Sequence, residues 1–258
     1  MKGPERLSSA SNPLLVRVRR LGRDGGAYRK LGEVLIEGEH LCGAAVSRGW
    51  RASVALISEA AWDLPERRAL AQQADRTVIL PEALLRGLST LESPGDVAFV
   101  ISQPAPRPFD PVRTTVVLDR LQDAGNVGSI LRSASALGVS QVLAVKGTAA
   151  LWSPKVLRAG MGAHFGLALI EGLEVDDVLR LGVPLVVTSS HALETLPLAT
   201  LPRPCAWVFG HEGQGVGPAI LAASSLQVRI PQPGGEESLN VAAAAAICFY
   251  EALRQTAQ

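Results

Sequence analysis

Short apolar segments alternate with helical ones along this chain, and this alternation most strongly constrains its fold. In the second half, "TTVVL", "QVLAV" and "PLVV" are continuous apolar runs, separated by segments such as "NVGSILRSASALGV". Strands that are buried on both faces have this composition, and parallel strands need long crossovers, which are usually helices. The sequence therefore predicts an α/β domain with a mainly parallel sheet that helices cover on both faces.

The first half repeats this alternation, with strand-like segments such as "EVLIEG", "RASVALIS" and "DVAFVIS". The segment "QPAPRPFDP" between the two halves holds four prolines in nine residues, as is typical of a stiff, extended linker. We therefore predict an N-terminal α/β domain over residues 1–102, a linker over 103–112 and a C-terminal domain over 113–258.

Charge is nearly balanced over the whole chain, with a formal net charge of +1. A nucleic-acid interface would therefore have to be local. One segment in the first domain, residues 17–30, is strongly basic, since Asp24 is its only acidic residue. We predict that this segment contacts an RNA backbone, and a solvated surface is the alternative. Its basic residues are Arg17, Arg19, Arg20, Arg23, Arg29 and Lys30.

The sequence lacks the signals that are typical of several functional classes. The longest uncharged apolar run, "VAAAAAICFY", is much shorter than the ~20 residues of a membrane helix. The N-terminus lacks the apolar stretch of a signal peptide. The three cysteines form no CxxC pair, and the four histidines show no metal-ligand spacing. We expect a cytoplasmic protein with buried, reduced thiols, no bound metal and no membrane association.

A first motif lies in "LQDAGNVGSILRSASALGV", residues 121–139. We expect Asn126 to stand just before a helix and to cap its free N–H groups. Arg132 is the lone charge of that helix and shares a face with small residues, which leaves room for a bulky anion such as a phosphate. A solvated arginine is the alternative. The small residues of this face are Ser129, Ser133 and Ala136.

A second motif is "WVFGHEGQGVG", residues 207–217, in which a buried strand runs into four glycines that surround Glu212. Glycine allows a backbone to approach a ligand closely. The motif is not a dinucleotide fingerprint, because the glycines come late in the domain and Pro218 follows them. This placement argues against a nicotinamide-dependent oxidoreductase. The motif is either a ligand loop or a plain turn.

A third motif is "VRIPQPGGEESLNVAAAAAICFYE", residues 228–251. The pattern predicts a strand, a Pro/Gly loop and a long helix that begins near Ser238, with Ser238 as its cap. Glu236 and Glu237 would lie near the positive N-terminal end of that helix. Five alanines would let another backbone or subunit pack closely, although a capped, buried helix is the alternative.

Together, the three motifs resemble those of the SpoU/TrmH family of RNA ribose 2′-O-methyltransferases. The resemblance covers residues 113–258, and a softer one relates the first ~95 residues to the family's smaller, ribosomal-protein-like α/β domain. Two departures are Gly160 and Ala242, where the family often has serine. The matching residues are Asn126, Gly128 and Arg132 in the first motif; Phe209, Gly210, Glu212, Gly213 and Gly215 in the second; and Ile230, Pro231, Glu237, Ser238, Leu239, Asn240 and Val241 in the third.

The resemblance implies a deep trefoil knot in the C-terminal domain, bound S-adenosylmethionine, and an obligate homodimer whose two active sites use residues of both chains. It implies 2′-O-methylation of a ribose in structured RNA, and 23S ribosomal RNA is the favoured substrate. Methylation of tRNA and a non-catalytic RNA-binding or assembly role are the alternatives. The 2′-hydroxyl would restrict the substrate to RNA.

The resemblance also assigns roles to residues. Arg132 would meet the RNA, and whether it takes the proton of the hydroxyl or stabilises the resulting anion stays open. The implied catalytic residues are Arg132, Asn126, Glu212, Ser238 and Asn240. The implied cofactor-binding residues are Thr188, Ser189, Gly210, Gly213, Ile230, Ser238 and Leu239, from the loops at 188–190, around 210 and at 230–239.

Overall fold

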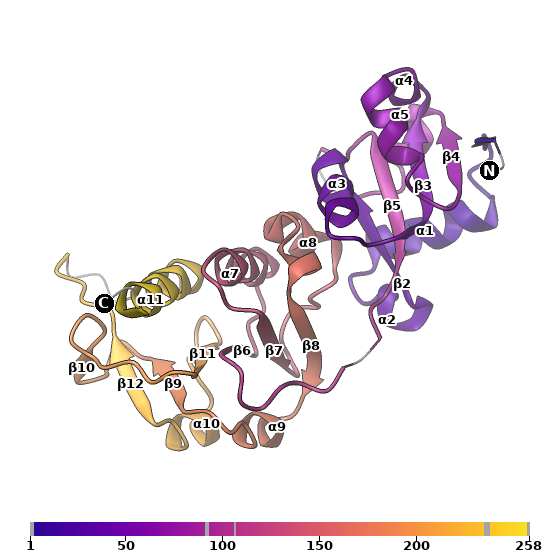
Figure 1. Cartoon of the computed structure of the whole chain (residues 1–258). Helices are drawn as coiled ribbons and strands as arrows, with labels where there is room; N and C mark the ends of the chain where they lie inside the picture. Colours follow the sequence, from indigo (N-terminus) through magenta and orange to yellow (C-terminus); the bar gives the residue numbers. More distant parts are fainter. Residues whose placement is uncertain (1–2, 91–92, 106, 235–237, 257–258) are drawn as a thin grey trace. The chain divides into compact units, whose positions relative to one another are not determined.

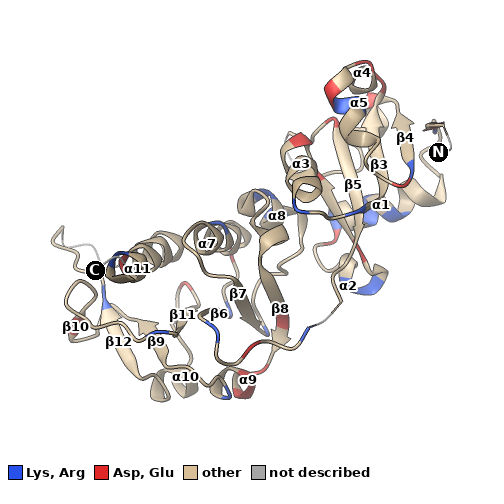
Figure 2. Cartoon of the chain, viewed as in Figure 1, with Lys and Arg blue, Asp and Glu red and all other residues tan. Residues whose placement is uncertain are grey.

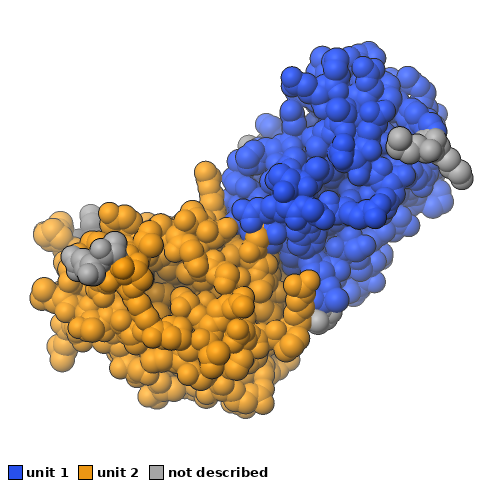
Figure 3. Space-filling view, viewed as in Figure 1, with its two compact units in different colours: residues 1–105, 152–165 blue, residues 106–151, 166–258 orange. Residues whose placement is uncertain are grey.

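The computed structural model describes residues 3–90, 93–105, 107–234 and 238–256 (Figure 1). The chain forms two compact units (Figure 3). Unit 1 comprises Met1–Ala105 and Trp152–Phe165, and unit 2 comprises Pro106–Leu151 and Gly166–Gln258. The second segment of unit 1 comes from the part of the sequence that we assigned to the C-terminal domain.

Aromatic packing attaches this segment to unit 1. The ring of Trp50 lies 5.7 Å from the ring of Trp152 and 5.4 Å from that of Phe165, measured between centroids. The Trp50 indole also donates a hydrogen bond of 3.1 Å to the Phe165 carbonyl oxygen. Buried aromatic rings of this size contribute much of the packing energy of a small core. These contacts explain why residues 152–165 belong to unit 1.

The sheet of unit 1 is mixed. Its strand order is β1-β4-β3-β5-β2, in which β1, β4 and β3 pair in parallel and β5 pairs antiparallel to both β3 and β2. The strands are β1 (Glu5–Arg6), β2 (Glu33–Glu37), β3 (Ala52–Ser58), β4 (Thr77–Leu80) and β5 (Val97–Ser102), and the helices are α1 (Pro13–Arg23), α2 (Ala27–Leu31), α3 (Glu39–Ser47), α4 (Glu59–Trp62), α5 (Pro65–Ala71), α6 (Glu82–Arg86) and α8 (Pro154–Gly160), with the short 3₁₀ turn η1 (Ala163–Gly166) after α8.

The sheet of unit 2 has the order β10-β12-β9-β11-β6-β7-β8, and its neighbouring strands all pair in parallel. This confirms the predicted α/β class and parallel sheet. The strands are β6 (Thr115–Asp119), β7 (Gln141–Val145), β8 (Ala168–Leu173), β9 (Leu185–Thr188), β10 (Glu194–Thr195), β11 (Ala206–Gly210) and β12 (Leu226–Arg229), and the helices are α7 (Ala124–Ala136), α9 (Val175–Leu179), α10 (Pro218–Ala222) and α11 (Val241–Thr256).

Helices cover both faces of this second sheet, with α7 and α11 on one face and α9 and α10 on the other (Figure 1). Strand β11 shows why its sequence is continuously apolar. The Phe209 ring meets that of Phe249 on α11 at 5.6 Å. The neighbouring Val208 packs in a separate cluster with Val178 of α9 and Ile220 of α10. Successive side chains of a strand point to opposite faces, so both must be apolar here.

The order of the strands reverses next to β6. The chain runs from β6 to β7 and β8 on one side, and then crosses to β9, β11 and β12 on the other. Strands β6 and β11 are therefore neighbours at the point of reversal. In open parallel sheets, ligands bind beyond the carboxyl ends of the strands at such a point. The topology therefore predicts a ligand site at the loops that follow β6 and β11.

Both helix caps near these loops differ from the sequence predictions. Helix α7 begins at Ala124, and the Asp123 side chain caps it by accepting a 2.7 Å hydrogen bond from the Asn126 N–H. The prediction that Asn126 caps this helix was therefore wrong, because Asn126 lies within the first turn. Helix α11 begins at Val241 rather than near Ser238.

The cap of α11 is Asn240, because its side-chain oxygen accepts hydrogen bonds from the Ala242 and Ala243 N–H groups at 2.9 and 3.2 Å. The predicted cap, Ser238, precedes the helix by two residues and was wrong. The predicted positions of Glu236 and Glu237 at this helix end lie outside the described residues. Within the described ranges, no helix has the length and apolar character needed to cross a membrane.

A close backbone approach in unit 1 gives a test of the packing. A Cβ on Gly22 of α1 would lie 2.3 Å from the Leu88 carbonyl oxygen, whereas one on Gly43 of α3 would meet no atom within 4 Å. We expect Gly22→Ala to lower the free energy of unfolding by ~1–3 kcal/mol through overpacking. Gly43→Ala, the matched control, should raise it by ~0.5–1 kcal/mol through helix propensity. Urea denaturation followed by circular dichroism measures both, and equal effects would contradict the packing.

Candidate active site

Two loops meet beyond the carboxyl ends of β6 and β11. One covers residues 120–123, and the other, residues 211–217, is called the glycine loop below. Glu212 of the glycine loop joins them, because its carboxylate accepts hydrogen bonds from the Gln122 and Asp123 N–H groups at 3.3 and 3.2 Å. A single side chain thus satisfies backbone donors that follow β6 and precede α7.

Asn126 connects the same carboxylate to α11. Its side-chain amide donates a 3.3 Å hydrogen bond to Glu212, and its side-chain oxygen accepts a 2.9 Å bond from the Asn240 amide. The two bonds fix the orientation of the Asn126 amide, because its donor and acceptor face different partners. Asn240 is held in turn by capping α11. One residue from each sequence motif therefore enters a single hydrogen-bonded network.

The network controls the charge of Glu212. Partial burial raises the pKa of this carboxyl, but hydrogen bonds from its own backbone, from the Asn126 side chain and from the backbone of Asp123 and Gln122 outweigh that effect. The net result is a pKa below the ordinary value for glutamate. Glu212 is therefore ionised at neutral pH, where it acts as a hydrogen-bond acceptor and not as a proton donor.

A cavity of about 160 Å³ opens beside this network, where β9, β11 and β12 end and α11 begins. Six of the residues predicted to bind a cofactor line it. Gly213 does not line it, since this residue lies nearer the tip of the glycine loop and donates a 3.0 Å hydrogen bond to His211 Nδ1. The six lining residues are Thr188, Ser189, Gly210, Ile230, Ser238 and Leu239.

Backbone packing shapes the wall of the cavity. A Cβ on Gly210 would lie 2.2 Å from the carbonyl carbon of Gly215, so glycine is required where the loop folds back on the end of β11. His211 also lines the cavity, and its Nδ1 accepts from the Gly213 and Gln214 N–H groups. Sequence reasoning missed His211, although the residue lies within the second motif.

Arg132 stands apart from these contacts. It is exposed on α7, and within the described part of the chain its side chain forms no hydrogen bond or ion pair. It does not line the cavity. The structure therefore brings together Asn126, Glu212 and Asn240, with Ser238 at the cavity, and leaves the Arg132 guanidinium available to an external anion.

The basic residues predicted to contact RNA lie on α1 and α2 of unit 1 (Figure 2). Most are exposed, whereas Arg19 is half-buried. Arg17 is already paired with Glu33 at 2.8 Å, and the Arg29 guanidinium lies 5.2 Å from the centre of the Tyr28 ring. Across the described ranges, no group of three or more His, Cys, Asp or Glu residues is arranged to hold a metal ion.

The three cysteines, Cys42, Cys205 and Cys248, are free and buried. Burial raises the pKa of the Cys205 thiol to about 11, and it raises the pKa of the other two as well. These thiols are therefore protonated at neutral pH and are poor nucleophiles.

The site offers a cavity for a ligand, an ordered carboxamide–carboxylate network and a nearby exposed guanidinium. That set suits the binding and orientation of a ligand.

Comparison with known proteins places this geometry in a family. The SpoU rRNA Methylase family matches residues 113–250. An uncharacterized tRNA/rRNA methyltransferase of Synechocystis sp. is 34% identical, over 96% of this chain and 93% of that protein. The 23S rRNA (guanosine(2553)-2′-O)-methyltransferase of Bacillus subtilis is 31% identical, over 86% of this chain and 88% of its own length.

A solved structure is similar across both units. The SpoU methyltransferase AviRb of Streptomyces viridochromogenes, in complex with the cofactor AdoMet, superposes with a TM-score of 0.87 at 27% identity. The similarity covers 96% of this chain and 99% of that one. The motifs, the parallel sheet and these similarities agree, and the chain belongs to the SpoU rRNA methylase family.

Proposed function

We propose that this protein transfers a methyl group from S-adenosylmethionine to the 2′-hydroxyl of a ribose in structured RNA. The observation that carries the proposal is the Asn126–Glu212–Asn240 network, which joins all three motifs beside a cavity at the reversal point of the sheet. The exposed guanidinium of Arg132 adds a group for the RNA on the same helix as Asn126.

The cavity has the chemical character that the cofactor needs. Ile230 and Leu239 offer apolar surface, and Thr188, Ser189 and Ser238 offer hydroxyl groups. The bare backbone at Gly210 permits close approach. When bound, S-adenosylmethionine supplies an electrophilic methyl group on a positively charged sulfur. We assign Gly213 to the same site through its position in the glycine loop.

Arg132 and the hydrogen-bonded network would act on the ribose. A ribose hydroxyl is a weak nucleophile, and a guanidinium, which stays protonated in proteins, is a reluctant base. We therefore assign Arg132 to binding an RNA phosphate and stabilising the anion that forms as the 2′-hydroxyl passes its proton to solvent water. The hydrogen-bonded Asn126, Glu212 and Asn240, with Ser238, would hold the ribose and the surrounding loops in place.

The finer features of the fold belong to the proposal as well. We assign a deep trefoil knot to the region 113–258, a rare topology in proteins. It is supported by the convergence of the segments that follow β9, β11 and β12 on one cavity. We assign residues 1–102 to a ribosomal-protein-like RNA-binding domain and 103–112 to the linker that follows it.

The favoured substrate is 23S ribosomal RNA. The support is a relative named for that substrate, which aligns with most of this chain and not only with the region 113–250. A tRNA substrate is the second candidate, because the name of another relative includes both RNA classes. We also assign the protein to the cytoplasm, which is where a bacterial relative such as that of Bacillus subtilis meets ribosomal RNA. Mapping of 2′-O-methylated nucleotides with and without the protein decides between the two.

The proposal includes a homodimer built on α11. Ala243, Ile247 and Tyr250 follow one another at the spacing of one helix face, and all three are exposed. The exposed fractions are 41% for Ile247 and 61% for Tyr250. An apolar stripe on a helix is suited to burial against a second copy of the same helix.

Removal of the Arg132 guanidinium tests the catalytic assignment. We expect Arg132→Ala to lower kcat by about 10²-fold or more, on the scale of a lost preorganised electrostatic group. Affinity for S-adenosylmethionine should not change, because Arg132 does not line the cavity. Transfer of a labelled methyl group to 23S rRNA measures kcat, and calorimetry measures cofactor binding. Arg113→Ala, an exposed arginine of the same unit, is the control, and near-normal turnover of Arg132→Ala would refute the assignment.

A charge on the exposed face of α11 tests the dimer. We expect Ile247→Glu to convert the dimer to a monomer, because a carboxylate would be buried without a partner. Light scattering during gel filtration measures the mass. The control is Leu179→Glu on α9, whose exposed fraction of 40% matches the 41% of Ile247. A monomeric wild type, or an Ile247→Glu variant that stays dimeric, would contradict this interface.

Neutralisation of the basic segment tests the RNA contact of unit 1. We expect replacement of Arg19, Arg20 and Arg23 by glutamine to weaken RNA binding. The plot of the logarithm of the association constant against the logarithm of the salt concentration should become less steep, by about 2. The matched control replaces Arg6, Arg51 and Arg76, which are already paired with carboxylates in the same unit. Binding isotherms at several salt concentrations give the slope, and an unchanged slope would mean that the segment is only solvated.

A further inference from the structure

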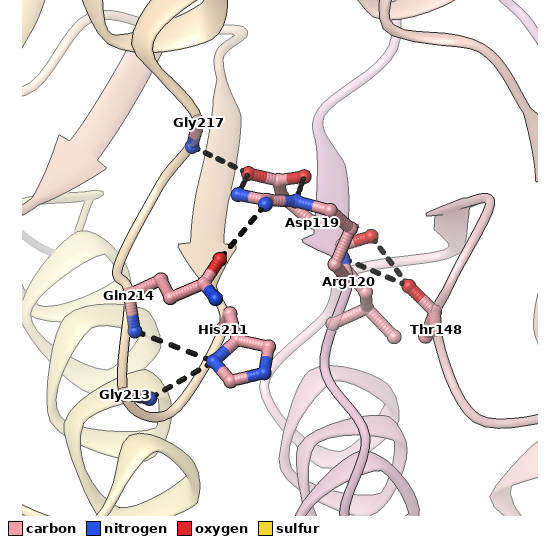
Figure 4. Close-up of polar contacts among 8 residues, drawn as sticks. Asp119, Arg120, Thr148, His211, Gly213, Gln214 and Gly217 are labelled. Carbon is pink, nitrogen blue, oxygen red and sulfur yellow. Dashed lines mark hydrogen bonds and ion pairs between the residues drawn. The ribbon is translucent and has the colours of Figure 1, made fainter.

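The carboxylate of Asp119 is a buried anchor at the end of β6 (Figure 4). The residue is fully buried, and its Oδ2 accepts a 2.6 Å hydrogen bond from the N–H of Gly217, the last residue of the glycine loop. The Arg120 side chain donates to both carboxylate oxygens, at 2.9 and 3.2 Å. A buried charge is stable only when it is paired and hydrogen-bonded, and these three bonds meet that condition.

Arg120 reaches this carboxylate through an unusual backbone conformation. Its φ is 61°, in the left-handed region that side chains other than glycine seldom adopt. The Arg120 N–H donates a 3.1 Å hydrogen bond to the Thr148 hydroxyl, which itself donates to the Leu118 carbonyl oxygen. The turn directs the guanidinium back onto Asp119, which also raises the pKa of Arg120.

The same guanidinium reaches the middle of the glycine loop. Its Nη1 donates a 3.3 Å hydrogen bond to the side-chain oxygen of Gln214 (Figure 4). The glycine loop is therefore fixed at Gly217 by Asp119, at Gln214 by Arg120, and at Glu212 by the segment that leads into α7. Between these points lie Gly215 and Val216, which line the cavity.

We propose that Asp119 and Arg120 are a positioning pair for methyl transfer, which hold the glycine loop in the shape that receives the cofactor and keeps Glu212 on Asn126. Neither residue lines the cavity, so they act through Gly217 and Gln214. This inference rests on the proposed function, since it assigns the cavity to S-adenosylmethionine. It differs from a purely structural pair in one respect: cofactor affinity depends on the guanidinium even when the fold does not.

Replacement of Arg120 separates these two roles. Arg120→Gly and Arg120→Asn remove the guanidinium, while both residues tolerate a left-handed backbone. We expect both variants to stay folded at the assay temperature, with a melting temperature lowered by several degrees because the buried Asp119 carboxylate loses its charged partner. We expect the Kd for S-adenosylmethionine, measured by calorimetry, to rise about tenfold, as for the loss of a charged hydrogen bond. The KM for the cofactor should rise similarly, and the KM for RNA should change less than about twofold.

Two further variants bracket this result. Gln214→Ala removes only the bond between Arg120 and the glycine loop, and we expect a smaller loss of cofactor affinity, of about threefold. Arg180→Ala is the matched control. This arginine, the C-cap of α9, also pairs with an aspartate of unit 2, Asp177, but within the described residues the pair makes no hydrogen bond or ion pair with the glycine loop. Its cofactor affinity should equal that of the wild type.

The outcomes separate this inference from the function on which it rests. A wild-type protein that binds no S-adenosylmethionine would overturn both. A wild type that binds, with Arg120→Gly and Arg120→Asn variants of equal affinity, would overturn the positioning pair alone. The same holds for variants that lose only thermal stability. Weaker cofactor binding by variants that are fully folded at the assay temperature, with Arg180→Ala unaffected, supports the pair.

Discussion

The parallel pairing of β6 with β11 is the constraint on which the rest of the site depends. Their register places Leu118 opposite Phe209 and Asp119 opposite Gly210, so both strands end at the same level of the sheet. Two chain segments that are some ninety residues apart therefore leave the sheet side by side. The hydrogen bonds that join the glycine loop to the start of α7 require this common starting point.

The residues within these strands and those in the loops that follow them differ in polarity for a physical reason. Within the sheet, β11 is covered on both faces, and only apolar side chains such as Val208 and Phe209 fit there. Beyond the sheet, backbone N–H groups have no strand partner and must be satisfied by side chains. Glu212, Asp123 and Asn240 fulfil this need. The polar groups that organise the site thus also complete the hydrogen bonding of the loops and helix ends.

Most of these polar side chains are committed to one another, whereas Arg132 is not. Asn126 uses its donor on Glu212 and its acceptor on Asn240, so its orientation is settled without a ligand. Preorganised groups of this kind need little rearrangement when a substrate arrives. An exposed arginine without a partner in the described structure has the opposite property, since its hydrogen-bonding capacity is available to an incoming anion.

Features of the fold that depend on local sequence patterns could be predicted, whereas features that depend on long-range contacts could not. The apolar runs of β6, β7 and β9 predicted the parallel sheet, because burial on both faces leaves a direct mark on composition. The caps of α7 and α11 were misplaced by a few residues, since several neighbouring polar residues were competent and only geometry selects Asp123 and Asn240. The attachment of residues 152–165 to unit 1 was not foreseen, because it depends on Trp50, about a hundred residues earlier.

Local sequence patterns were sufficient to predict the class of the fold, the three motifs and the residues that carry them, because periodicity and residue type are local properties. Which of those residues meet depends on the long-range packing of the chain. It joined Asn126, Glu212 and Asn240, placed six predicted residues along one cavity and left Arg132 outside the network. It also revealed the pair of Asp119 and Arg120, because a buried carboxylate at a strand end acquires its partners only when distant loops pack against it.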